Sequence, residues 1–145
     1  MIRNEKQYKI TRAHLKKFKE ALLERQAMSA PEGVEAGMWE LEQDALKSQI
    51  EDLRLEVLAY EKLKAGEVEE LELSSFADLA NSLIQARIAQ GLTQKELAEK
   101  LQVKEQQVQK DEANQYETAS LSRLRHIAEV LGLEFEGQVR LPVRH

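Results

Sequence analysis

The 145-residue chain contains no cysteine, which excludes disulfide bonds, thiolate chemistry and cysteine-based zinc sites. Its three histidines show no metal-binding spacing, and there is no glycine-rich phosphate loop or other catalytic signature. No apolar run approaches the roughly 20 residues that span a membrane, and the first residues do not begin a signal peptide. We therefore expect a cytoplasmic protein without catalytic residues, metal, cofactor or membrane contact.

Aromatic residues are also scarce, at 5% of the chain, whereas charged residues make up 32%. This composition is typical of a helix-rich protein with a modest core, and the length suits one domain or one small domain with an appendage. The net charge is −5, with 16 acidic against 12 basic residues before position 74 and 10 against 9 from there on. Neither half of the chain is basic.

The stretch from Leu83 to Leu133 predicts a short helix, a tight turn and a second short helix, with a flanking helix on either side. Thr93 can cap a helix that places its few apolar residues on one face, and Ser120 can cap the flanking helix that follows the motif. The following run, residues 104–110, has only Val108 to bury. A helix that is polar almost all round is either solvated or in contact with something polar.

This stretch resembles the Cro/repressor-like (XRE) helix-turn-helix family over about 50 residues, which implies a lambda-repressor-like domain of the five-helix type whose second motif helix enters the major groove. The residues that carry the resemblance are Arg87, Gly91, Leu92, Thr93, Gln94, Glu96, Leu97, Ala98, Val103, Val108, Glu112, Ile127, Ala128, Leu131 and Gly132. Because the helix-turn-helix half is not basic, we expect few phosphate contacts and a need for dimerisation.

The resemblance also implies which residues contact DNA: Gln94 a phosphate, and Glu105, Gln106 and Lys110 the bases. Glutamine can bond adenine bidentately, lysine can bond guanine, and glutamate can accept from cytosine. The full expected DNA-binding set is Gln94, Lys95, Lys104, Glu105, Gln106, Gln107, Gln109, Lys110, Ser120 and Arg123.

Three positions depart from the family pattern. Lys104 stands where a serine or threonine cap is usual, and Gln102 where glycine is frequent. Asp111 stands where an aromatic or aliphatic residue normally packs inward, so we expect it to weaken core packing and to repel phosphate.

Two helices are expected before this domain. Thr11 is a candidate cap for the first, which runs to about Gln26, and its basic face would be solvated or would touch DNA or an acidic partner. The second, from Met38 to about Lys64, carries apolar residues at the 3-4 spacing of a coiled-coil seam. It could pair with the first helix, with its own copy, or with both, and we favour both. The seam residues expected at a dimer interface are Leu46, Ile50, Leu53, Val57 and Tyr60.

Near the C-terminus, Phe135, Val139 and Leu141 fall in an alternating pattern that predicts a strand, which would pair with its symmetry mate in a dimer. The expected fold is therefore all-α: an N-terminal helical hairpin with a long coiled-coil-like helix (1–66), an acidic connector (67–73), and a helix-turn-helix domain with a short C-terminal β-strand (74–145).

We interpret the chain as a homodimeric, sequence-specific repressor that binds double-stranded DNA at an inverted repeat. Its small size, acidic charge and residues 104–123 are also similar to HigA-type antitoxins, which implies a small basic ribonuclease toxin as a second partner. The alternatives are a stand-alone XRE-type regulator and a helical scaffold whose helix-turn-helix no longer binds DNA.

Overall fold

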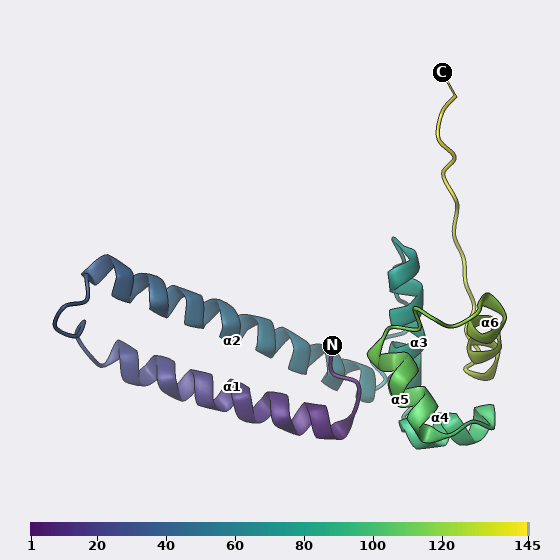
Figure 1. Ribbon diagram of the computed structural model, residues 1–145, viewed down its shortest axis with the longest axis horizontal. Helices are drawn as coiled ribbons and strands as arrows, with labels where there is room; N and C mark the ends of the chain where they lie inside the picture. The colour runs from purple at the N-terminus through teal and green to yellow at the C-terminus, as the bar shows by residue number, and fades with distance from the viewer. Residues whose placement is uncertain (145) are drawn as a thin grey trace.

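The computed structural model describes residues 1–144, and His145, for which we expect no function, lies outside the described residues. Within that range the structure is all-helical, with six helices and no strand (Figure 1). The helices are α1 (Glu5–Gln26), α2 (Ala36–Lys64), α3 (Phe76–Ala89), α4 (Gln94–Leu101), α5 (Glu105–Ala113) and α6 (Leu121–Val130). None of them is long and apolar enough to cross a membrane.

Helix α1 begins about two turns earlier than the sequence suggested. The cap is Asn4 rather than Thr11, because the Asn4 side chain accepts a hydrogen bond from the backbone N–H of Gln7 at 2.9 Å. The polar residues that follow Asn4 continue the helix, since none of them breaks it. At the other end of the hairpin, α2 stops before Gly66, whose φ of +71° is a left-handed conformation that glycine adopts without strain.

Helices α1 and α2 run antiparallel and pack along their lengths (Figure 1). Leu15 of α1 and Val57 and Tyr60 of α2 are buried in the single chain, and the Tyr60 ring lies 5.1 Å from the Tyr8 ring. At the far end, Arg25 of α1 contacts α2.

This packing involves the same residues as the expected dimer interface. Val57 is 8% exposed and Tyr60 4%, while Leu46, Ile50 and Leu53 are half-buried, so this seam is largely occupied within one chain. A 3-4 apolar spacing indicates a helical partner but does not distinguish a neighbouring helix from a second copy.

Helices α3 to α6 enclose a second group of buried residues, among which Leu83, Ile84, Leu97, Val108 and Ile127 are almost completely buried. Phe76 on α3 is 89% exposed. It is the first residue of α3, and this end of the helix extends beyond the neighbouring helices, so no element covers it (Figure 1).

The predicted C-terminal strand is wrong. Residues 134–144 have no regular secondary structure and extend away from α6 (Figure 1), leaving Phe135, Val139 and Leu141 exposed. A strand needs a partner for its backbone N–H and C=O groups, and the described part of the chain contains no other strand. In the connector, Val68 packs against the core while Leu71 and Leu73 remain exposed.

Candidate nucleic-acid interface

The first motif helix, α4, starts at a complete capping box. Thr93 Oγ1 accepts from the Glu96 backbone N–H at 3.1 Å, and Glu96 Oε1 accepts from the Thr93 backbone N–H at 3.2 Å. The bond from the Thr93 backbone N–H, with a smaller contribution from the Thr93 side chain, lowers the pKa of the Glu96 carboxyl, because it favours the charged form. The cap predicted at Thr93 is therefore confirmed.

The turn between α4 and α5 is tight because the chain reverses at Gln102, whose φ is +58°. The Val103 N–H then donates to the Ala98 carbonyl at 3.0 Å, which closes the end of α4. The requirement for a left-handed residue explains why glycine is frequent at this position in the family that the stretch resembles. Helix α5 starts at Glu105, and its N-cap residue Lys104 makes no side-chain cap bond.

Helix α5 has one buried side and one exposed side. Val108 and Glu112 are buried, at 1% and 0% exposure. Among the residues expected to contact DNA here, Gln107 is half-buried. The others are exposed: Lys104, Glu105, Gln106, Gln109 and Lys110. The Gln109 amide donates to Glu105 at 3.3 Å, whereas no side-chain bond is recorded for Gln106 or Lys110. Two side chains with donor groups are therefore presented to a partner.

The buried side of α5 is held by an ion pair in the interior. Arg87 of α3 binds Glu112 through two parallel bonds, from Nε at 2.7 Å and from Nη2 at 2.8 Å. Both side chains are almost completely buried, at 3% and 0% exposure. Arg87 Nη1 also donates to the Leu92 carbonyl at 2.8 Å. The pair ties α5 to α3 and to the entry of α4, and so fixes the orientation of the exposed face.

Gln94 joins the same network, which changes its expected role. Its Nε2 donates to Glu112 Oε1 at 2.9 Å, and its Oε1 accepts from Asn4 at 3.5 Å. Gln94 is 8% exposed, so its side chain is committed to the interior and a phosphate contact would have to come from its backbone N–H. Its neighbour Lys95 is exposed.

The network also reaches the first residues of the chain, which the sequence pattern did not indicate. Arg87 Nη2 donates to the Arg3 carbonyl at 2.6 Å, and Ile2 is 3% exposed. Glu5 then accepts from the Tyr60 hydroxyl at 3.0 Å and pairs with Lys64 at 3.5 Å. Through these contacts the N-terminal segment holds the hairpin in place against the helix-turn-helix part.

Asp111, the departure expected to weaken packing, has its own partners. It is 3% exposed, forms an ion pair with Arg123 of α6, and accepts from the Gln107 amide at 3.0 Å. The acid is therefore compensated, and it links α5 to α6. The consequence for DNA is that the Arg123 guanidinium, expected to hold a phosphate, is already paired. Ser120 is exposed and caps α6 by accepting from the Arg123 N–H at 3.2 Å, as predicted.

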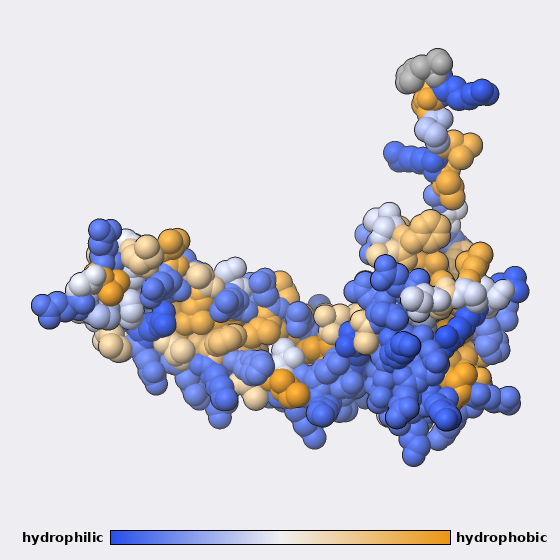
Figure 2. All heavy atoms as spheres, in the orientation of Figure 1, coloured by the Kyte–Doolittle hydropathy of each residue, from blue (hydrophilic) through white to orange (hydrophobic). Residues whose placement is uncertain are grey.

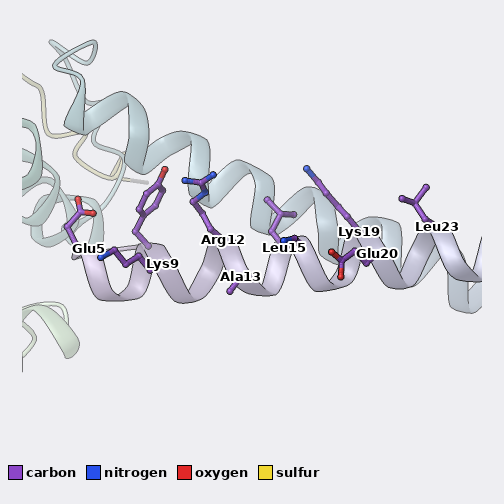
Figure 3. A pocket seen from close by; sticks show the side chains of 10 residues that line it. Glu5, Lys9, Arg12, Ala13, Leu15, Lys19, Glu20 and Leu23 are labelled. Atoms are coloured by element: carbon purple, nitrogen blue, oxygen red, sulfur yellow. The ribbon is translucent and has the colours of Figure 1, made fainter.

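The basic face of α1 is a separate feature. Lys9, Arg12, Lys16 and Lys19 line a shallow groove together with Leu15 and other residues of the same helix (Figure 3). The Arg12 guanidinium lies 5.6 Å from the centre of the Tyr8 ring, so one of these charges is stacked locally. Among residues 1–144 no group of acidic and histidine side chains could hold a metal ion.

Helices α3 to α6, with a tight turn before a short helix that is buried on one side and polar on the other, define a helix-turn-helix DNA-binding fold. A family model for this helix-turn-helix matches residues 83–138, which supports the XRE type and a DNA-binding regulator. Searches of the curated proteins and of the solved structures found no match.

Proposed function

We propose that the chain is a sequence-specific transcriptional repressor that binds DNA as a homodimer at an inverted repeat. The observation that supports this most directly is the exposed face of α5, where Gln106 and Lys110 lie on the opposite side from the buried Glu112. In a helix-turn-helix the start of this helix lies in the major groove. Gln106 can pair with adenine and Lys110 with guanine, while Glu105 can accept from cytosine.

The electrostatics of the domain favour two copies on one DNA site. Residues 74–145 carry 9 basic against 10 acidic residues, and two of the arginines, Arg87 and Arg123, are paired internally. Few cations remain to bind phosphates, so one copy contributes little sequence-independent affinity. Binding two half-sites about one helical turn apart adds the contributions of both copies.

Selection from random duplexes tests this proposal. The full chain should enrich an inverted repeat with half-sites spaced by roughly 10 base pairs. A Gln106→Ala/Lys110→Ala double variant should lose the enrichment while it keeps its helical circular dichroism. The matched control, Lys47→Ala/Gln49→Ala on the exposed side of α2, should enrich the same repeat. Failure of the wild-type chain to enrich any sequence at low salt would leave the scaffold alternative and contradict repression.

The finer proposal is that this repressor is the antitoxin of a toxin–antitoxin pair and represses its own operon. Its support is the similarity of residues 104–123 to HigA-type antitoxins and the net charge of −5, which is complementary to a small basic toxin. The hairpin, outside the helix-turn-helix part, is the place where such a toxin would bind.

Affinity purification from the native cell separates the antitoxin from a stand-alone regulator. Recovery of one small basic protein together with the protein's own promoter would support the antitoxin. Recovery of the promoter without any stoichiometric protein would contradict it and leave the stand-alone regulator.

A further inference from the structure

The C-terminal segment of the chain is apolar and uncovered. Residues 134–144 extend away from α6, and Val139, Leu141 and Val143 are 87%, 81% and 77% exposed. Figure 2 shows hydrophobic and hydrophilic residues following one another along this extension. We call residues 139–144 the tail; it also carries Arg140 and Arg144 and no acidic residue. Apolar side chains on an extended segment usually have a partner.

A groove of complementary character lies where the N-terminal segment, α2, the connector and α3 meet. Its floor is apolar and buried, formed by Ile2, Tyr60 and Leu63, and its rim includes Leu55 and Leu71, which are 49% and 37% exposed.

The charged side chains that line the groove are all acidic. Glu56, Glu72 and Asp78 line it, and none of the lining residues in the described chain is a lysine, an arginine or a histidine.

We propose that the tail of one copy of this chain occupies this groove in a second copy, and that the exchange is reciprocal. The apolar tail residues cover Leu55 and Leu71, and Arg140 and Arg144 meet the acidic rim. The segment that carries the tail extends from the end of α6 away from the rest of its own chain (Figure 1). The groove that the tail occupies is therefore more readily that of a second copy. This inference concerns assembly and does not depend on DNA binding.

Sedimentation of the full chain tests the proposal through variants on each side of the contact. The wild-type chain should be a dimer at micromolar concentration, and Leu141→Asp in the tail or Leu55→Asp in the groove should raise the dissociation constant at least tenfold. The matched control is Leu41→Asp, because Leu41 lies two heptads before Leu55 on α2, is 62% exposed and does not line the groove. This control should dimerise as the wild type does.

Mixing the two weakened variants distinguishes exchange from docking within one chain. A Leu141→Asp copy keeps an intact groove, and a Leu55→Asp copy keeps an intact tail. Each heterodimer in the mixture therefore has one intact contact, whereas a dimer of either variant alone has none. Association should therefore recover in part on mixing. No recovery on mixing, a monomeric wild-type chain, or a wild-type dimer that Leu141→Asp leaves intact would each overturn the proposal.

A charge exchange gives a second readout that does not depend on apolar packing. Arg140→Glu and Glu56→Arg should each weaken the dimer, and the double variant should bind better than either single variant. Additive loss in the double variant would contradict contact between the tail and the acidic rim.

Discussion

Replacing Glu112 with glutamine tests the buried network that orients α5. Glu112 accepts three hydrogen bonds, two from Arg87 and one from Gln94, and its side chain is 0% exposed. A glutamine of the same shape presents one N–H group where there was an acceptor and removes the counter-charge of a buried guanidinium. Breaking a buried ion pair from one side costs about 3–5 kcal/mol.

The lower end of that range applies here. Arg87 keeps its bonds to the Leu92 and Arg3 carbonyls, and the glutamine oxygen still accepts at least one bond. We therefore expect Glu112→Gln to lower the free energy of unfolding by about 3 kcal/mol, which corresponds to a fall of roughly 6–12 °C in Tm for a chain of this size.

Urea unfolding followed by circular dichroism at 222 nm measures the effect. With a slope of about 1–3 kcal/mol per molar urea, the midpoint should fall by at least about 1 M. The exposed Glu117→Gln, five residues further on, is the control and should leave the midpoint unchanged. A Glu112→Gln midpoint within experimental error of the control would refute the claim that this pair fixes α5.

Three further changes probe the interface. Gln102→Gly should raise the unfolding free energy by about 0.5–1 kcal/mol, because a left-handed non-glycine residue costs about 1–2 kcal/mol and glycine's extra freedom when unfolded returns only part of that; an unchanged urea midpoint would contradict it. Arg123→Gln should cost about 1–3 kcal/mol in the same assay, since it leaves the buried Asp111 without its cation, and a neutral result would mean that Asp111 needs no partner. Thr93→Ala should raise the pKa of Glu96 part of the way toward its ordinary value in a carboxyl NMR titration, because it keeps the larger contribution from the Thr93 backbone N–H and removes only that of the hydroxyl. Because that pKa is lowered in the folded chain, the wild-type contribution is present above the unfolded-state pKa and is lost as the pH falls through the folded-state pKa; an unshifted titration in the variant would mean that the Thr93 hydroxyl does not contribute to the lowered pKa.

Local features of the fold could be predicted from the sequence. The caps at Thr93 and Ser120 depend on one side chain and the next turn of backbone, so the residue type and its place before an apolar stripe were sufficient. The cap at Asn4 was missed for the opposite reason, since polar residues follow it and no apolar stripe marks the start of the helix.

Contacts between distant segments could not be predicted in the same way. The hydrogen bond from Arg87 to the Arg3 carbonyl could not be predicted, because every residue has a backbone carbonyl and the sequence does not mark the one that accepts. The ion pair between Asp111 and Arg123 was not predicted, because each residue was considered separately for its effect on DNA binding. The coiled-coil spacing of α2 indicated a partner helix, but it could not show whether Val57 and Tyr60 face α1 or a second copy.

The expected DNA-contacting residues divide in a corresponding way. Those on α5 lie together on one exposed face, as their helical spacing requires, apart from the half-buried Gln107. Gln94 and Arg123 are engaged by buried partners that only the folded chain brings near. A structural role for these two residues therefore stands beside any contact they make with DNA.

The most direct test of the central claim is base-by-base affinity for the selected DNA site. Binding of the wild-type chain and of Gln106→Ala would be measured by fluorescence anisotropy against duplexes that carry every substitution at each half-site position. If α5 reads bases, Gln106→Ala should lose discrimination at one base pair, by about 1–3 kcal/mol, and keep it elsewhere. Equal weakening at every position, with the base preferences intact, would contradict the assignment of α5 as the recognition helix.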